Sequence, residues 1–150
     1  MKFLERRTQW ANLAELYIGL LKEDVRKDMK DSDSPLKFWD FCAERRVCIN
    51  NLTAKNLFQL HGSNANQKII GSPGDISCLC QLGWFEWTYY RDHNSFPHQE
   101  QCLGRSLGPA SNYSNEMSHW ILKRTMKITA SHTFCQFTKE KYNDLNITSE

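Results

Sequence analysis

The sequence has no long apolar run and no marked excess of charge of either sign. A membrane span needs roughly 20 consecutive apolar residues, and no segment approaches that length. The N-terminal segment MKFLERRTQWANLAEL carries charges throughout and lacks the continuous apolar stretch of a secretory signal. These absences lead us to expect a protein without a membrane partner that is not secreted and resides in the nucleus or cytoplasm.

The sequence also has little net positive charge and no recognisable disulfide framework. In a reducing compartment its six cysteines are expected to be thiols. The formal net charge is only +2, so composition alone does not indicate a nucleic-acid-binding protein, and any such role must come from local patches. Aromatic residues, at 12%, are by contrast abundant enough to build a small core from large rings.

Helical periodicity dominates the first part of the chain. From Asn12 to about Lys30, apolar residues recur at three- and four-residue spacing, and they are Leu13, Leu16, Leu20, Leu21 and Val25. The DSDSP segment should break this helix, and a second helix should begin with Ser34 as its cap and Pro35 in its first turn. We expect the second helix to reach about Asn50 and to bury Phe38, Trp39, Cys42 and Ile49.

Short strands and turns dominate the second part. The alternation in WFEWTYYRD favours a strand, and we expect the chain to be extended from about Asp75. LGRSLGPASNYSN suits a bulged strand and a tight turn, while SHWILKR and MKITASHTF indicate two further short strands. The predicted architecture is α+β, with helices over residues 1–52, a connector over 53–74, a small β-barrel over 75–138 and a tail over 139–150.

Several of these segments together resemble a known family. WANLAELYIGLLKEDVRKDMKDSDSPLKFWDFCAERRVCINNLTAKNLFQL is similar to the end of the integrase core in copia-type retrotransposon polyproteins, particularly in lineages common in algae. GDISCLCQLGWFEWTYYRD and FPHQEQCLGRSLGPASNYSNEMSHWILKR are similar to the domain that follows this core. The most specific motifs are the NxAE helix start, WDxCxxRR, DIS with a downstream WxEW, and LGRxLGPA. The resemblance implies the last helices of an RNase H-like integrase core followed by an SH3-like β-barrel.

The resemblance gives Glu15 a specific meaning. Integrases of this superfamily hold two metal ions with three carboxylates, and the third lies on a helix that begins as Asn12 and Glu15 do here. Such paired cations stabilise the attacking and leaving oxygens of phosphoryl transfer. The family's two aspartates precede this helix, whereas Asp24, Asp28, Asp31 and Asp33 all follow Glu15. We therefore expect a vestigial carboxylate and no enzyme activity, or simply a solvated helix residue.

The same resemblance bears on cofactors. Mg²⁺ belongs to the intact family enzyme, and we expect no cofactor in this chain alone. Glu15 would hold a metal ion only if another chain supplied the missing carboxylates, because one carboxylate cannot build a two-metal site. We therefore expect a truncated integrase fragment that cannot carry out strand transfer by itself.

Basic residues provide the expected DNA contacts. Lys22 lies two helical turns after Glu15 on the same face, where related integrases have a lysine that meets DNA phosphate. The other candidates are Lys27, Lys30, Arg45 and Arg46 in the helices and Arg91, Arg105, Lys123, Arg124 and Lys127 in the barrel. Such contacts would give weak DNA binding without sequence preference, the alternative being ordinary solvated charge. Burial is favoured over base stacking for most rings of the barrel, which are Trp84, Trp87, Tyr89, Tyr90 and Trp120.

One departure from the family pattern predicts a weakened hairpin. The family has an Asn-Gly turn where this chain has Thr125-Met126, so a bulky residue stands where positive φ is wanted. With the missing aspartates, this change suggests a decayed element or a truncated gene, and a non-functional transposon relic is one alternative to DNA binding.

Three other functions are weighed against DNA binding. Zinc could be held by soft ligands among Cys78, Cys80, His93, His98 and Cys102, but their spacing differs from paired CxxC knuckles, and Cys78 and Cys80 would face opposite sides of an extended segment. A Cys–His hydrolase lacks a recognisable nucleophile motif. A protein-interaction module that joins integrase subunits is the stronger alternative, because the apolar stripe of the first helix lacks a sheet partner and should promote oligomers.

Overall fold

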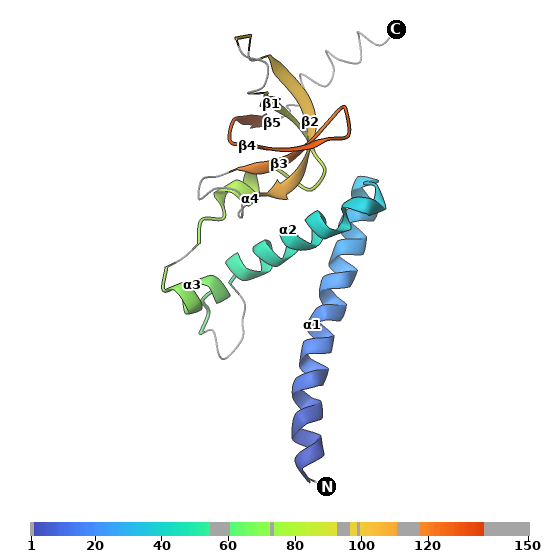
Figure 1. The fold of residues 1–150 in the computed structure, drawn as a ribbon. Helices are drawn as coiled ribbons and strands as arrows, with labels where there is room; N and C mark the ends of the chain where they lie inside the picture. Colours follow the sequence, from blue (N-terminus) through green and yellow to red (C-terminus); the bar gives the residue numbers. More distant parts are fainter. Residues whose placement is uncertain are drawn as a thin grey trace.

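The structure, a computed structural model, describes residues 2–54, 61–72, 74–92, 97–98, 100–110 and 118–136, with side chains from Ala14 onward except that of Cys78. Within these residues several helices precede a five-stranded antiparallel sheet, and the expected α+β class is confirmed (Figure 1). No helix in the described ranges combines the length and apolar character needed to cross a membrane.

The first two long helices meet at a short break. Helix α1 spans Lys2–Ser32 and so begins earlier than expected, and after it Asp33 takes a positive φ of 51°. A 3₁₀ turn, η1 (Leu36–Phe38), leads directly into α2 (Trp39–Leu52). The prediction that Ser34 caps the second helix is wrong, because Pro35 is the N-cap of η1 and no side chain caps either element.

Two short helices stand where other structure was predicted. Helix α3 (Ala65–Ile70) lies within the predicted connector. The Asn64 side chain caps its N-terminus by accepting a hydrogen bond from Gln67 N–H at 2.7 Å, and Gly71 ends the helix with a φ of 85°. Helix α4 (Ser77–Gln81) replaces the extended chain that was expected from Asp75. The Asp75 carboxylate accepts the Ser77 N–H at 2.8 Å, and this local bond favours a turn over a strand.

The sheet consists of β1 (Trp87–Arg91), β2 (Gln101–Pro109), β3 (His119–Lys123), β4 (Ile128–Ser131) and β5 (Phe134–Gln136). Its order is β4-β3-β2-β1-β5 with antiparallel pairing throughout. The strand predicted over MKITASHTF corresponds to β4, and the last residue of that segment, Phe134, begins β5. In the described residues β4 and β5 lie at opposite ends of this order, so the sheet is open.

The strand patterns read from the sequence agree with the structure in two places. Along β1, Thr88 and Tyr90 are buried while Trp87 and Arg91 are exposed, as the alternation predicts. In β2 the register with β3 shifts between Ser106 and Pro109, which confirms the predicted bulge. Gly108 lies in this bulge with φ 100°, and a Cβ there would lie only 3.1 Å from Arg45 Cβ on α2, so glycine serves both the bulge and the helix contact.

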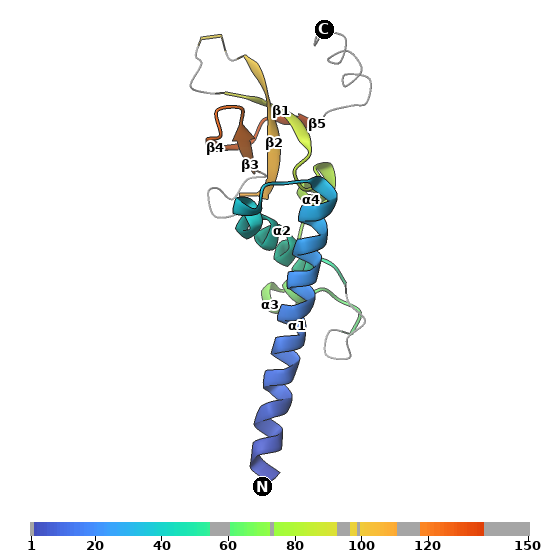
Figure 2. The same ribbon diagram turned by 90° about the vertical axis from the view of Figure 1, so that its right-hand side faces the viewer.

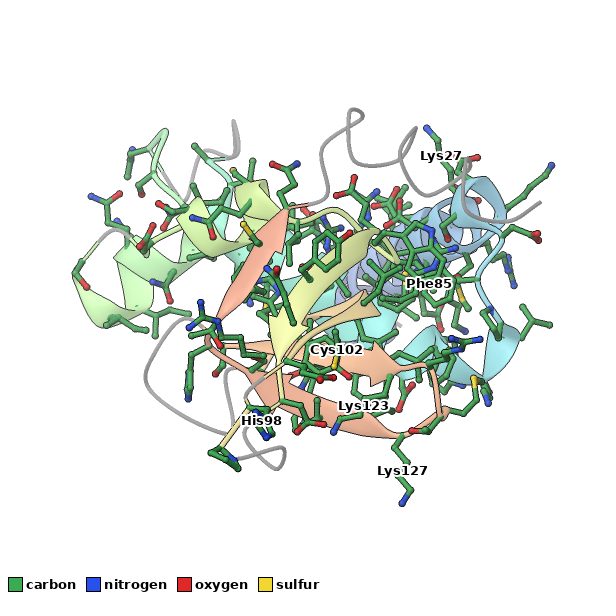
Figure 3. All side chains as sticks on the ribbon, turned by 90° about the horizontal axis from the view of Figure 1, so that it is seen from above. Lys27, Phe85, His98, Cys102, Lys123 and Lys127 are labelled. Carbon is green, nitrogen blue, oxygen red and sulfur yellow. The ribbon has the colours of Figure 1, made fainter. Side chains whose placement is uncertain are left out.

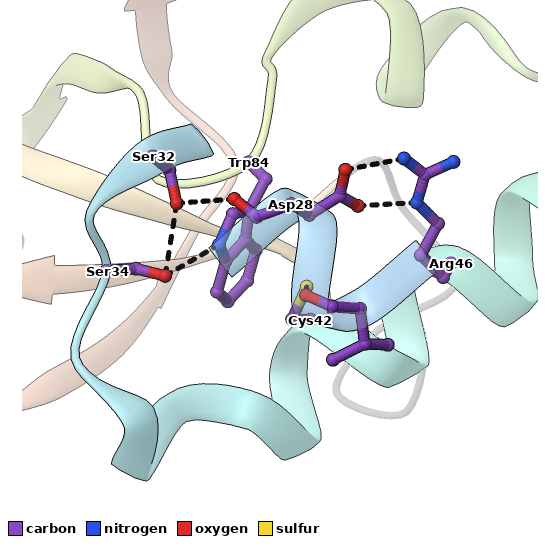
Figure 4. Close-up of polar contacts among 7 residues, drawn as sticks. Asp28, Ser32, Ser34, Cys42, Arg46 and Trp84 are labelled. Carbon is purple, nitrogen blue, oxygen red and sulfur yellow. Dashed lines mark hydrogen bonds and ion pairs between the residues drawn. The ribbon is translucent and has the colours of Figure 1, made fainter. Parts of the chain in front are cut away.

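The hydrophobic core is shared by the helices and the sheet. Its buried members are Val25, Met29, Phe38, Cys42, Trp84, Leu107 and Leu122. Helix α2 contacts both α1 and β2, and the buried Trp84 donates its indole N–H to Ser34 Oγ at 3.1 Å (Figure 4). The predicted helical part and the predicted β part therefore pack as one unit around this core.

Apolar residues outside the core are exposed on the helices. The N-terminal half of α1 extends away from the other elements (Figure 2), and there Leu16 is 57% and Leu20 48% exposed. The expected exposure of the apolar stripe is therefore confirmed for these two residues. Trp39 was expected to be buried and is 61% exposed at the first position of α2.

Candidate nucleic-acid interface

The C-terminal half of α1 sorts its charged residues into lengthwise rows. Residues four apart on a helix lie above one another, and the rows are Leu21, Val25 and Met29; Lys22, Arg26 and Lys30; Glu23, Lys27 and Asp31; and Asp24, Asp28 and Ser32. The first row faces the core, where Val25 and Met29 are buried. The second row contains only cations, and we call Lys22, Arg26 and Lys30 the basic row.

One carboxylate of α1, that of Asp28, is neutralised within the protein. Both carboxylate oxygens of Asp28 accept hydrogen bonds from the Arg46 guanidinium on α2 (Figure 4). This bidentate bond raises the pKa of Arg46 above its ordinary value. The Arg46 cation is thus committed to an internal ion pair, which joins α1 to α2 and opposes its predicted contact with phosphate.

The basic row borders a groove between α1 and the start of α2. The groove, of about 570 Å³, is lined by Lys22, Val25, Arg26, Met29, Lys30, Asp33, Ser34, Leu36 and Trp39. Asp33 is the sole carboxylate among these lining residues. All three cations are exposed, and none of them forms an ion pair with a carboxylate of the described residues. The predicted contacts Lys22 and Lys30 are therefore brought together.

Lys27 is separated from the other predicted contacts on α1. It lies in the mixed row between Glu23 and Asp31, and it does not line the groove. Its side chain extends outward from the helix (Figure 3). Of the predicted contacts on α1, the groove therefore brings together Lys22 and Lys30 but not Lys27.

A second cleft brings together Arg45, Arg46 and Arg105. Three carboxylates, Asp28, Asp31 and Glu86, line the same cleft, so its charge is balanced. Burial, before any effect of neighbouring charges, lowers the pKa of Arg45 from its ordinary value. These three arginines therefore line one cleft, but in surroundings less favourable to an anion than the basic row.

Arg105 is further held by aromatic and backbone contacts. Its guanidinium lies 3.7 Å from the ring centre of Trp87 and 4.8 Å from that of Phe85, distances that suit cation–π attraction. It also donates a hydrogen bond to the Phe85 carbonyl at 2.9 Å. Arg105 thus stabilises the turn before β1, where Phe85 adopts a positive φ of 57°.

The remaining predicted contacts lie on and beside the sheet. Lys123, labelled in Figure 3, forms an internal ion pair with Asp92, with 2.7 Å between Lys123 Nζ and a carboxylate oxygen. Arg124 and Lys127 are exposed in the β3–β4 hairpin, and Arg91 is exposed at the end of β1. The five basic residues predicted for the barrel are thus divided between a cleft, an ion pair, a hairpin and a strand end.

Most rings of the sheet contribute to packing. Trp84 and Tyr90 are buried, and Trp120 packs edge-on against Phe41 with ring centres 6.2 Å apart. Burial, followed by the charges of Cys102 and Asp92, raises the pKa of Tyr90 to about 12. The preference for burial is therefore confirmed for Trp84 and Tyr90, while Trp87 is 37% exposed beneath Arg105.

Glu15 does not form part of a metal centre with other described residues. Its side chain is exposed on α1, and no group of three or more His, Cys, Asp or Glu side chains within the described ranges is arranged to hold a metal ion. A single carboxylate does not provide the donor set that a two-metal site requires, so no step through a metal ion is derived for this chain.

Some of the candidate zinc ligands lie outside the residues that the structure describes. His93 and the side chain of Cys78 are not among the described groups. Cys80 is exposed on α4, so the expectation that Cys78 and Cys80 alternate along an extended segment is wrong. His98 lies just before β2, and Cys102 is the second residue of that strand (Figure 3).

Sequence reasoning missed three residues of the groove. Arg26 completes the basic row, and its four-residue spacing from Lys22 and Lys30 was visible in the sequence. Leu36 and Trp39, 80% and 61% exposed, gave no such signal, because an apolar residue near a helix start is usually expected in the core. Their exposure depends on the angle at which η1 and α2 leave α1.

Comparisons with known proteins identify no relative. No family model, no curated protein and no solved structure matches the chain. A functional proposal therefore depends on the residues and their arrangement, together with the resemblance described above.

Proposed function

We propose that this chain is a non-catalytic nucleic-acid-binding protein that contacts backbone phosphates through the basic row of α1 without reading base sequence. In its finer form, the proposal is that the chain is part of a retrotransposon integrase. Its helices would then be a remnant of the RNase H-like core, and its sheet would correspond to the SH3-like domain. The observation that carries the proposal is a row of exposed cations that have no carboxylate partner among the described residues.

The basic row differs from the other rows of α1 because it contains only cations. Successive cations of the basic row are about 6 Å apart along the helix axis, so an extended polyanion can meet several of them at once. Other basic groups, such as Arg46 and Lys123, already have carboxylate partners. Binding phosphates at the basic row would release counterions without breaking an internal ion pair, and the net charge of +2 fits weak binding.

Catalysis is not part of the proposal. Strand transfer needs three carboxylates that hold two metal ions, and Glu15 supplies one of them in the family pattern. DNA integration would then require two further carboxylates, which the described residues do not place beside Glu15. The contribution of this chain would be affinity for DNA and contacts with other integrase subunits.

Fluorescence anisotropy with a labelled mixed-sequence duplex tests the proposal. We expect binding that weakens between about 50 and 200 mM salt, with the logarithm of the association constant falling by about 0.9 for each phosphate contact per tenfold rise in salt. Lys22→Ala, Arg26→Ala and Lys30→Ala should each weaken binding to all sequences equally and reduce the salt slope by about 1.

Lys27→Ala is the matched control, because Lys27 is equally exposed on the same helix but lies between acidic residues. It should change affinity and slope much less than Lys22→Ala or Lys30→Ala. The proposal is overturned if the full chain binds no nucleic acid at low salt, or if removal of the whole basic row leaves affinity unchanged.

Self-association is a second candidate function, and the exposed apolar residues of α1 favour it. Leu16, Ile18 and Leu20 are each about half exposed or more, and such a surface commonly marks a protein contact. Sedimentation velocity at low and high salt separates the two candidates. Oligomers that persist at high salt and dissociate in Leu16→Glu, without any affinity for DNA, would favour the interaction module. A non-functional relic would show neither DNA binding nor self-association.

A further inference from the structure

We propose that Trp39 is a stacking platform for an unpaired base, so that the groove beside the basic row binds single-stranded nucleic acid in preference to duplex. This inference rests on the proposed function and specifies its ligand. It assigns a binding role to an exposed ring at the start of α2, opposite the basic row.

The surroundings of Trp39 differ from those of the other described tryptophans. Trp84 is buried and hydrogen-bonded, Trp87 is covered by Arg105, and Trp120 packs against Phe41. Trp39 is 61% exposed, and no ring contact or cation–π contact joins it to a described residue. An exposed indole without an internal partner retains a large apolar surface that a ligand can cover.

The position of Trp39 relative to the cations suggests how a strand would bind. Trp39 and the basic row line the same groove, with the ring on α2 and the cations on α1. A base could stack on the indole while its neighbouring phosphates reach the cations across the groove. Leu36, 80% exposed beside Trp39, adds apolar surface for the same base or its sugar.

The expected preference for single strands follows from base accessibility. In a duplex each base is already stacked between its neighbours, and exposing a face to Trp39 requires unstacking or unpairing. An unpaired base has a free π-face, and stacking on an aromatic side chain tolerates any sequence. The cations would attract both forms, whereas the ring would add affinity for the unpaired form alone.

Charge complementarity favours nucleic acid over a protein segment in this groove. Three cations face a single lining carboxylate, Asp33. An acidic peptide could satisfy the same cations, but it offers no planar base to the exposed indole. Polyglutamate is therefore the competitor that distinguishes a general polyanion site from a base-stacking site.

The experiment compares the full chain and its variants by anisotropy with a labelled oligothymidine strand and with a duplex of equal length. Trp39→Ala should weaken single-strand binding roughly 5- to 150-fold, the range expected for loss of one stacked base. It should change duplex binding little and leave the salt slope unaltered, because the phosphate contacts remain. Trp39→Phe keeps a ring and should restore most of the affinity.

Trp87→Phe is the matched control, since it alters a partly exposed tryptophan in the other cleft. Intrinsic fluorescence provides a second readout. Oligothymidine should quench tryptophan emission in the parent and in Trp87→Phe, and the quenching should be largely lost in Trp39→Phe. Circular dichroism and thermal melting verify that each variant folds, which the exposure of Trp39 leads us to expect.

The possible outcomes separate the two proposals. If the chain binds neither single strands nor duplex, the proposed function itself fails. If it binds nucleic acid but Trp39→Ala weakens both forms equally or neither form, the stacking inference fails while phosphate binding stands. Polyglutamate affinity that depends on Trp39 as strongly as oligothymidine affinity does would also overturn the stacking inference. Selective loss of single-strand binding supports it.

Discussion

The β3–β4 hairpin contains a residue in an unfavourable backbone conformation, and replacing it should stabilise the protein. Met126 has φ 62°. The loop is closed by hydrogen bonds from Met126 N to the Lys123 carbonyl at 2.9 Å and from Lys123 N to the Lys127 carbonyl at 2.8 Å. This is the three-residue hairpin in which the left-handed position favours glycine. The Met126 side chain is 54% exposed, so little packing holds it there.

The expected gain is estimated by comparing Met126→Gly with Met126→Ala. Both variants remove the side chain beyond Cβ, but only glycine removes the left-handed penalty of about 1–2 kcal/mol. Glycine loses more conformational entropy on folding, which costs about 0.5–1 kcal/mol. Met126→Gly should therefore be more stable than Met126→Ala by about 0.5–1 kcal/mol. Near the melting temperature, 1 kcal/mol corresponds to about 2–4 °C for a domain of this size.

Urea unfolding followed by tryptophan fluorescence measures the difference, with thermal melting by circular dichroism as a second observation. Thr125 provides the control, because it occupies the preceding loop position and is not among the positive-φ residues of the described chain. There the order should reverse, with Thr125→Ala more stable than Thr125→Gly. If Met126→Ala equals or exceeds Met126→Gly in stability, the conformational argument is refuted.

Three further predictions concern the core. Burial, with a smaller effect of Asp28, raises the pKa of the fully buried Cys42 thiol from 9.0 to about 11. As pH rises, the thiol therefore ionises in the unfolded chain before it does so in the folded protein. The contribution of the Cys42 thiol to stability should be complete below pH 9 and be lost as pH rises toward 11. The midpoint of urea unfolding, measured as a function of pH, would show this loss of stability, and the loss should be smaller in Cys42→Ala. Ser34→Ala leaves the buried Trp84 N–H without its hydroxyl acceptor and should cost about 1–3 kcal/mol in urea unfolding, whereas an unchanged midpoint would contradict that bond. Gly104→Ala places a Cβ 2.6 Å from Ile121 Cγ2 and should cost about 1–3 kcal/mol by the same assay; a neutral effect would mean that β2 and β3 can separate locally.

The two clefts differ in what they offer to an anion. In the cleft that holds Arg45 and Arg105, three arginines face three carboxylates, so an incoming phosphate would compete with internal partners. Along the basic row, phosphates meet cations with one lining carboxylate nearby. This difference is why nucleic-acid binding is proposed for α1 rather than for the larger predicted set on the sheet.

Local sequence determined many elements of this protein, because their causes lie within a few residues. The apolar spacing predicted most of α1, the alternation predicted that side chains along β1 face opposite sides, and Thr125-Met126 indicated a strained hairpin. The extended segment expected after Asp75 is instead α4, and the Asp75 carboxylate accepts a hydrogen bond from Ser77 N–H at its start. That competition between a local turn and a strand is poorly resolved by periodicity alone.

The tertiary structure alone decided how the charges and rings are used. The sequence offered Lys22, Lys27 and Lys30 as contacts on α1, but the way α1 packs places only Lys22 and Lys30 beside the groove. Sequence reasoning also expected Trp39 in the core, whereas the break after α1 places Trp39 at an exposed helix start. The sequence supplies the cations and the indole. Whether they share one groove depends on how the chain turns at the break between α1 and α2, which the spacing of apolar residues does not show.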